Sequence, residues 1–496
     1  MTASTFGKLF SCTVDAEVYA QPLYVANFAL AGGTHNVVLV ATQNDSVYAF
    51  DADAKPCVQY WKKSFLGTGI TTVPPADVIE TGDINTKIGI TGTPVIDFAT
   101  STLYVVAKTK ETVGTGCSVG SPCYFQRLHA LDVATGAERF NGPANISSAI
   151  TIPGSGDTGD STCPSTTGNV PFCPLRQNQR PGLLLSNGKV YIAWASHGDN
   201  QPYHGWVIGY NAANLAQAPV LFNTTPDGGL GGIWMTGTGP AADAAGNIYV
   251  ITGNGTFDTG TPRTNYGDSF IKLSTTAGLS VADFFTPANQ DFLNGNDFDV
   301  GSGGAIVVDS TGTHPHLLIG GDKQGVLYVI DRDTMTGFNI GGDQILQTVP
   351  ITAGPACIIC GIFSTPAFWE GKLYVVAIRD VLKQYTVING SLSLLPAVQA
   401  GDMFGVPGAS PAVSSNGATN GIVWALDATN NSTNGSANGP AILFAYEANN
   451  LNKLYSSPAS GAGAAGNAVK FVVPTVANGK VYVGTQTELS VFGLLP

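Results

Sequence analysis

The sequence has few charged residues and no long apolar run. Only 11% of its 496 residues are Asp, Glu, Lys or Arg, and the net charge is −12. Such a chain would repel a nucleic-acid backbone or another anionic polymer, so we expect no nucleic-acid partner. No stretch approaches the roughly 18 consecutive apolar residues of a membrane helix, and we therefore predict no membrane span.

The start of the chain, Met1 to Ser4, lacks a basic and apolar leader. The eight cysteines nevertheless indicate disulfides, and hence a secreted or periplasmic protein whose leader has been removed. Cys357 and Cys360 could instead form a redox or zinc motif, but no second closely spaced cysteine pair lies nearby. The predicted disulfides are Cys117–Cys123, Cys163–Cys173, Cys357–Cys360 and a long-range pair, Cys12–Cys57.

Glycine and proline are abundant, at 62 and 29 residues, which is typical of short strands joined by turns. One Pro-centred segment recurs eight times, and an apolar strand follows each copy. Seven copies keep the proline, whereas the fifth has Gly304 in its place. Because proline cannot donate to a strand ladder, it belongs at a strand start or an edge, such as the innermost strand of a propeller blade. The copies begin at Gln21, Thr93, Arg180, Gly239, Gly303, Thr365, Ser410 and Val473.

Eight copies in 496 residues leave 62 residues for each unit, more than the roughly 40 to 50 of a four-stranded blade. The surplus lies in long loops, which is where binding usually resides. Residues 7–25 carry strand material before the first complete unit, and the last apolar strand lies at the C-terminus. We therefore predict an all-β fold, a single domain over residues 1–496. It is an eight-bladed β-propeller of four-stranded antiparallel blades, closed by pairing of the N- and C-terminal strands.

Between Gly231 and Leu273, Gly-Gly-Ile-Trp234 is followed by Gly253-Asn254-Gly255 and then by Tyr-Gly-Asp268-Ser. In this order the stretch resembles the quinoprotein dehydrogenases, eight-bladed propellers that carry pyrroloquinoline quinone (PQQ) and calcium. The resemblance implies that Trp234 stacks on the quinone and that Asn254 gives calcium an oxygen ligand. The alternatives are a core aromatic for Trp234 and an ordinary turn residue for Asn254.

The next unit contains Asn296-Asp297-Phe298-Asp299 and then Gly321-Asp322-Lys323. These segments are similar to the family's catalytic aspartate and to its quinone-binding Lys or Arg. The resemblance implies that Asp299 takes the hydroxyl proton and also lies at the metal, while Lys323 binds the quinone and stabilises its reduced form. The alternatives are a turn-capping aspartate and a solvated hairpin lysine.

The sequence also departs from the family. Its segment 196–206 has no glutamate where the family has a calcium ligand, and Asp199 is the carboxylate that remains to replace it. Adjacent cysteines and a haem-binding Cys-x-x-Cys-His are both missing, so a dehydrogenase would need an external electron acceptor.

His197 and His204 lie seven residues apart in this polar segment. They are candidates for a transition-metal site or for acid–base chemistry on a sugar, and Asp297 is a further carboxylate candidate. The leading hypothesis is PQQ- and calcium-dependent oxidation of a small-molecule alcohol or carbohydrate hydroxyl. Two alternatives stay open: a non-catalytic propeller that binds a glycan or a protein, and a carbohydrate lyase or hydrolase.

Overall fold

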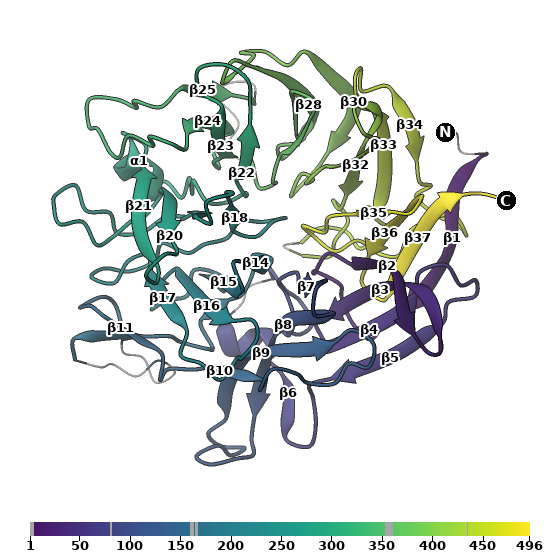
Figure 1. Ribbon diagram of the computed structural model, residues 1–496, viewed down its shortest axis with the longest axis horizontal. Helices are drawn as coiled ribbons and strands as arrows, with labels where there is room; N and C mark the ends of the chain where they lie inside the picture. Colours follow the sequence, from purple (N-terminus) through teal and green to yellow (C-terminus); the bar gives the residue numbers. More distant parts are fainter. Residues whose placement is uncertain (1–3, 80–81, 159–162, 164–166, 353–360, 434) are drawn as a thin grey trace.

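The computed structural model describes residues 4–79, 82–158, 163, 167–352, 361–433 and 435–496. It is nearly all β, with eight four-stranded antiparallel blades arranged around a central axis (Figure 1). The predicted eight-bladed propeller is therefore confirmed. Among the described residues, no helix has the length and apolar character needed to cross a membrane.

Each blade runs from an inner strand at the axis to an outer strand at the rim. Blades 1 to 4 are β2 (Leu23–Leu30), β3 (Gly33–Thr42), β4 (Ser46–Asp51), β5 (Gln59–Ser64); β7 (Val95–Asp97), β8 (Thr102–Glu111), β9 (Cys123–Asp132), β10 (Ala144–Ile146); β14 (Leu184–Ser186), β15 (Lys189–Ser196), β16 (Trp206–Asn211), β17 (Val220–Asn223); and β18 (Ala241–Ala242), β19 (Ile248–Ile251), β20 (Phe270–Ser274), β21 (Ser280–Phe285).

Blades 5 to 8 continue the ring in the same way. They are β22 (Ile306–Asp309), β23 (His316–Gly321), β24 (Val326–Asp331), β25 (Gln347–Pro350); β26 (Ala367–Trp369), β27 (Lys372–Val375), β28 (Asp380–Ile388), β30 (Val398–Phe404); β31 (Ala412–Asn416), β32 (Thr419–Asp427), β33 (Ile442–Glu447), β34 (Lys453–Ser456); and β35 (Thr475–Ala477), β36 (Lys480–Gly484), β37 (Glu488–Leu494), β1 (Phe6–Thr13).

Short elements in the long loops were not predicted from the sequence. They add edge strands to blades 2, 3 and 6, a separate two-stranded ribbon and two helical turns. These elements are β6 (Ile70–Thr72), β13 (Gln177–Asn178), β29 (Ser391–Leu392), β11 (Thr151–Pro153), β12 (Asn169–Pro171), the 3-10 helix η1 (Pro75–Val78) and α1 (Gln290–Gly295).

The repeated proline marks the start of the inner strand. In six blades the strand begins on the residue directly after the proline, as it does after Pro22 and Pro366. The exceptional fifth copy has a steric reason. A Cβ at Gly304 would lie 2.1 Å from Thr238 Cγ2 and 2.3 Å from Thr365 Oγ1, atoms that precede the inner strands of blades 4 and 6. Glycine is therefore needed where three neighbouring segments meet.

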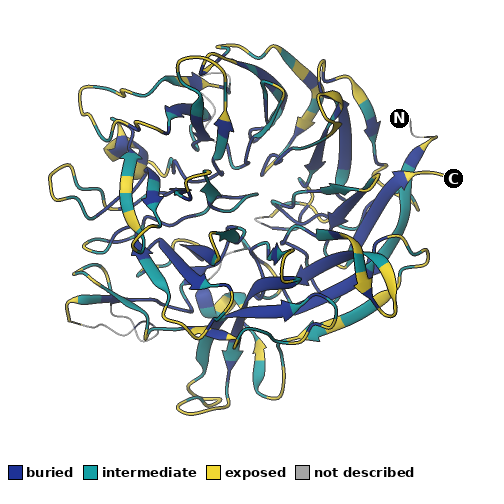
Figure 2. Ribbon diagram, viewed as in Figure 1, coloured by how far each residue is buried: buried dark blue, intermediate teal, exposed yellow. Residues whose placement is uncertain are grey.

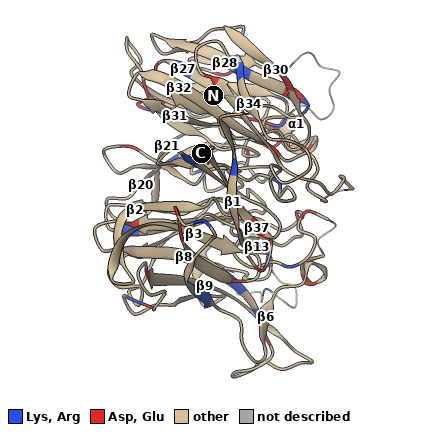
Figure 3. Ribbon diagram, turned by 90° about the vertical axis from the view of Figure 1, so that its right-hand side faces the viewer, with Lys and Arg blue, Asp and Glu red and all other residues tan. Residues whose placement is uncertain are grey.

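The core consists of apolar layers between adjacent blades. The second and third strands of each blade are largely buried, whereas the outer strands and turns are more exposed (Figure 2). Both faces of a middle strand are covered, so these strands are continuous apolar runs. Charged residues are sparse in the ribbon of Figure 3, as the low charge content predicts.

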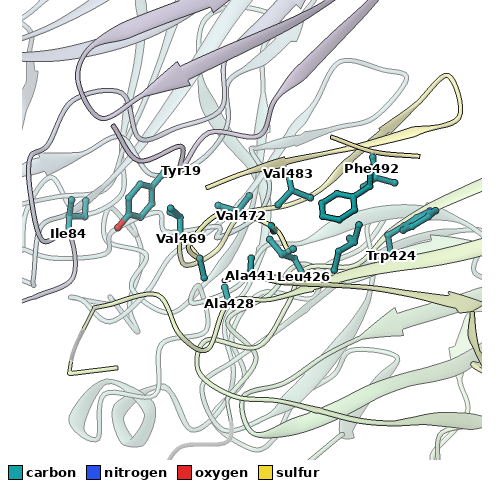
Figure 4. Packing of buried hydrophobic residues seen from close by; sticks show 14 of the residues in the cluster. Tyr19, Ile84, Trp424, Leu426, Ala428, Ala441, Val469, Val472, Val483 and Phe492 are labelled. Carbon is teal, nitrogen blue, oxygen red and sulfur yellow. The ribbon is translucent and has the colours of Figure 1, made fainter. Parts of the chain in front are cut away.

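Strand β1 closes the ring by pairing antiparallel with β37, as predicted. The pair is reinforced by an ion pair between Lys8 and Glu488 at 2.7 Å. The ring centroids of Phe6, in β1, and Trp424 lie 5.6 Å apart. Both residues belong to an apolar cluster between blades 7 and 8 that continues inward to Tyr19 (Figure 4). The two ends of the chain are therefore held by one sheet and one core layer.

Three of the predicted disulfides are present. Cys12–Cys57 joins β1 of blade 8 to the loop before β5 of blade 1, across the closure of the ring. Cys117–Cys123 joins the β8–β9 loop to the first residue of β9, and Cys163–Cys173 joins the segment between β11 and β12 to the segment after β12. The fourth predicted pair, Cys357–Cys360, lies outside the described residues.

Asp15 holds the segment after β1 against blade 1. Its carboxylate accepts hydrogen bonds from Thr42 and Ser46 at 2.7 Å and from Asn44 at 2.9 Å, and Lys62 lies 2.9 Å away. Burial alone would raise the pKa of Asp15, but these four partners together lower it to about 2. Ionised Asp15 therefore stabilises the fold above the unfolded pKa of 3.8, and this contribution is lost as pH falls toward 2.

We expect Asp15→Asn to lower the free energy of unfolding at pH 7 by about 2 kcal/mol, the equivalent of its pKa shift. The variant should also lose stability less steeply than the wild type between pH 4 and pH 2. Denaturant unfolding at several pH values measures both effects. Asp333→Asn, at an exposed turn, is the control and should change little. An unaltered pH profile in Asp15→Asn would contradict this account.

Candidate functional site

A cavity of about 170 Å³ lies at the axis of the propeller. Four of the predicted site residues line it: Asp199, Trp234, Asp299 and Lys323. They come from blades 3, 4 and 5. Asp199 follows β15, Trp234 lies in the segment between β17 and β18, Asp299 lies between α1 and β22, and Lys323 is in the turn between β23 and β24. The ring thus brings together side chains that are up to 124 residues apart.

Asp299 is buried, with 6% of its surface exposed. Its Oδ1 accepts a hydrogen bond from the backbone N–H of Asn254 at 2.6 Å, and its Oδ2 forms an ion pair with Lys323. The approach to Asn254 requires Gly253, because a Cβ there would lie 2.2 Å from the Asp299 carboxylate. The Gly-Asn-Gly turn therefore positions Asp299 through its backbone.

Lys323 links the two aspartates of the Asn-Asp-Phe-Asp segment. Its backbone N–H donates to the Asp299 carbonyl oxygen at 3.1 Å, and its Nζ donates to Asp297 Oδ1 at 2.7 Å. Burial alone would lower the pKa of Lys323, but the charges of Asp299 and Asp297 raise it overall. Lys323 therefore stays protonated, and it offers a fixed positive charge beside the cavity.

Two further aspartates lie near Asp299, of which Asp268 is buried and Asp199 is exposed. Asp199 accepts a hydrogen bond from the hydroxyl of Tyr203 at 2.8 Å, and Asp268 accepts one from the Gln290 amide at 3.2 Å. Desolvation raises the pKa of both carboxyls, and the negative charge of Asp299 raises each further. The cavity wall also contains Arg180, Lys323 and Lys470, so acidic and basic side chains lie together around it.

Asn254 lies at the wall of the site rather than in the lining of the cavity. Its side-chain amide donates to Asp297 at 2.9 Å, whereas its buried Oδ1 has no hydrogen-bond partner among the described residues. An unsatisfied buried amide oxygen is costly, and it is a ligand type that calcium prefers. Within the described ranges, however, no three His, Cys, Asp or Glu side chains form a metal site by themselves.

No family model and no curated protein sequence matches the chain. Solved structures do. The quinohemoprotein alcohol dehydrogenase ADHIIG from Pseudomonas putida matches at 16% identity and a TM-score of 0.55, over 100% of this chain and 78% of that one. A europium-containing methanol dehydrogenase matches at 15% and 0.54, over 99% and 93%. The chain shares the eight-bladed propeller fold of these dehydrogenases.

This fold also serves proteins that are not dehydrogenases by name. BamB from Moraxella catarrhalis matches at 13% identity and a TM-score of 0.52, over 98% of this chain and 97% of that one. Identities this low establish the fold alone.

The two histidines contact different parts of the protein. His197 Nε2 lies 2.8 Å from Nζ of Lys108, and burial followed by the charge of Lys108 lowers its pKa. His204 has Nδ1 3.0 Å from the Thr225 carbonyl oxygen and Nε2 2.8 Å from the Asp157 carbonyl oxygen. Burial lowers its pKa as well, although these carbonyls partly oppose the shift. Both rings are buried and hydrogen-bonded, and neither lines the cavity of Asp299.

The sequence did not predict the cavity-lining residues that lie outside the quinoprotein-like motifs. Arg180 was noted only as part of an inner-strand repeat, and Phe363, Lys470 and Phe471 were not singled out. Lys470 forms an ion pair with Asp83 at 2.5 Å. For two of these residues, the place in the repeat could have indicated a role in the cavity wall. Arg180 and Phe471 lie one and three residues before inner-strand prolines, and the inner strands start near the axis.

Proposed function

We propose that the protein is a PQQ-dependent type of dehydrogenase that oxidises an alcohol or sugar hydroxyl. The observation that carries the proposal is the shared cavity of Trp234, Asp299 and Lys323, with Asn254 hydrogen-bonded to Asp299. These residues were selected from the sequence, by their resemblance to quinoprotein motifs and by the order of those motifs. Their meeting at one axial cavity is what a common ligand requires.

The residues present fit the quinone and calcium in donor chemistry. Trp234 offers a half-buried aromatic face to the cavity, and Asn254 Oδ1 is an unsatisfied amide oxygen beside the Asp299 carboxylate. Asp199 would take the place of the family's glutamate. When bound, the quinone supplies the hydride acceptor and calcium supplies a Lewis acid.

The chain's own residues would bind and orient the substrate hydroxyl and take its proton. Asp299 is the base in this proposal, because its carboxylate lines the cavity, forms an ion pair with Lys323 and accepts a hydrogen bond from the Asn254 N–H. Lys323 would then compensate negative charge that develops in the cavity. No haem-binding motif occurs in the sequence, so electrons would pass to an external acceptor. The three disulfides support an exported location.

The deciding experiment adds PQQ with calcium to the purified protein and follows uptake by absorbance, then reduction of a dye with alcohols and sugars. We expect saturable uptake, and we expect Trp234→Ala to weaken it by about tenfold or more through loss of ring stacking. Trp61→Ala, on the outer strand of blade 1, is the matched control. No uptake by the wild type would overturn the proposal.

A binding propeller without chemistry is the second candidate. The observation that favours it is the missing glutamate, together with the lack of a self-contained metal site among the described residues. In that case the axial cavity would hold a ligand, such as part of a glycan, without turnover. Binding of glycans without quinone uptake would support this candidate.

A further inference from the structure

A second cavity, of about 200 Å³, lies along the axis next to the first. The two cavities share three lining residues, Tyr19, Arg180 and Phe471, which form the wall between them. The second cavity is lined by residues around the starts of the inner strands, such as Gln21, Thr93 and Thr238. We call it the inner cavity. It shares none of the proposed quinone-site residues.

Arg180 is the charged residue of this wall, and no acidic side chain among the described residues forms an ion pair with it. It is only 8% exposed, and its Nη2 has no hydrogen-bond partner among the described residues. Its one ring contact is with Phe471, whose centroid lies 5.1 Å from the guanidinium carbon. Burial lowers the pKa of Arg180 to about 10, and the opposing influence comes from Tyr19, not from a carboxylate. Even so, the guanidinium remains a cation at neutral pH.

A buried cation without a counter-charge is unfavourable unless an anion is bound. The other buried arginine among the described residues follows this rule. Arg332, 7% exposed, donates to the carbonyl oxygens of Val308 and Leu317 and forms an ion pair with Asp309. Arg180 differs from Arg332 because it lines two cavities and its guanidinium has no such carbonyl or carboxylate partners among the described residues.

The inner cavity suits an anion better than the first cavity does. The first cavity contains Asp83, Asp199 and Asp299 in its wall, whereas no acidic residue is found among the described residues that line the inner one. The inner cavity also offers hydroxyl donors. Thr93 Oγ1 accepts from the backbone N–H of Gln21 at 2.9 Å, which leaves its own proton for a ligand, and the Thr238 hydroxyl donates to no described residue.

We propose that the inner cavity binds a small carboxylate anion, held by Arg180 with the hydroxyls of Thr93 and Thr238. A guanidinium and two hydroxyls match the planar, two-oxygen geometry of a carboxylate. A cavity of about 200 Å³ limits the ligand to a compact acid. This site lies beyond the proposed quinone site and does not depend on it.

The test uses the full chain without quinone. Acetate is titrated against the melting temperature and by calorimetry, with ionic strength held constant by a bulky sulfonate buffer and with acetamide as the neutral counterpart. We expect a saturable rise in melting temperature with acetate and none with acetamide. Arg180→Gln should weaken acetate binding by about tenfold or more, because it removes a charge-assisted hydrogen bond. Arg139→Gln, a surface control, should leave binding unchanged.

Other outcomes would overturn the proposal. These are equal binding by Arg180→Gln and the wild type, no saturable effect of acetate, or a saturable effect of phosphate or chloride without one of acetate. A stability comparison provides a second readout. Without added anion, Arg180→Met should melt at or above the wild-type temperature, whereas Arg332→Met should melt below it. A loss in Arg180→Met as large as that in Arg332→Met would show that Arg180 is an ordinary structural residue.

Discussion

Asp299→Asn is expected to reduce alcohol-dependent dye reduction by between about a hundredfold and ten-thousandfold, the usual contribution of a general base. The side chain keeps its shape, so the Asn254 N–H can still donate to Oδ1. What is lost is the proton acceptor and the ion pair with Lys323. Steady-state kinetics with quinone-loaded protein measure the effect, and kcat should fall far more than KM changes.

Asp297→Asn provides the matched comparison for this first result. Its carboxylate also contacts Lys323 and Asn254, but its side chain is 71% exposed and it does not line the cavity. We expect a loss of less than about tenfold, since solvent-exposed ion pairs contribute little. Equal losses in the two variants would reject Asp299 as the base. Quinone uptake by Asp299→Asn, measured separately by absorbance, separates lost chemistry from lost binding.

Removal of the Cys12–Cys57 disulfide should have the largest effect on stability. The bond closes a loop of 45 residues, and on the chain-entropy account its loss costs about 4 kcal/mol. It also frees β1 to separate from β37, which would expose the edge of blade 8. We therefore expect Cys12→Ala/Cys57→Ala to unfold at a much lower denaturant concentration than the wild type.

Cys117→Ala/Cys123→Ala is the control for the ring-closing bond. These cysteines are separated by only 6 residues and lie at the tip of the β8–β9 hairpin. Their loss should cost about half as much on the same account, and it should leave the ring closed. Denaturant unfolding of both double variants gives the comparison. A larger loss in the control would contradict the role assigned to Cys12–Cys57.

The sequence predicted the ring because each unit repeats a local physical requirement. Proline at the start of an inner strand and an apolar strand after it are readable without knowledge of contacts, as at Pro22 and Pro366. Helix α1 was not predicted, since its six residues carry no apolar period long enough to detect. Gly304 was a visible exception, but its cause lies in Thr238 and Thr365, two blades apart.

The candidate site was predictable only in part, for a related reason. Trp234, Asp299 and Lys323 were selected by their order along two neighbouring units, and blades that are adjacent in sequence are adjacent in space. Arg180 and Phe471 are 291 positions apart, and they meet because the ring closes. Hydrogen-bond satisfaction is equally invisible in a sequence, so the unpaired Nη2 of Arg180 could be found only in the structure.

The closure of blade 8 has a consequence for how the protein is made. Lys8 and its partner Glu488 are 480 positions apart, so β1 leaves the ribosome long before the strand that it pairs with. Until β37 is made, β1 has no partner strand, the face of blade 1 toward blade 8 is not packed, and the ring stays open. A chain cut ahead of β37 would leave both β1 and β36 without their partner strand, and unpaired strand edges favour aggregation.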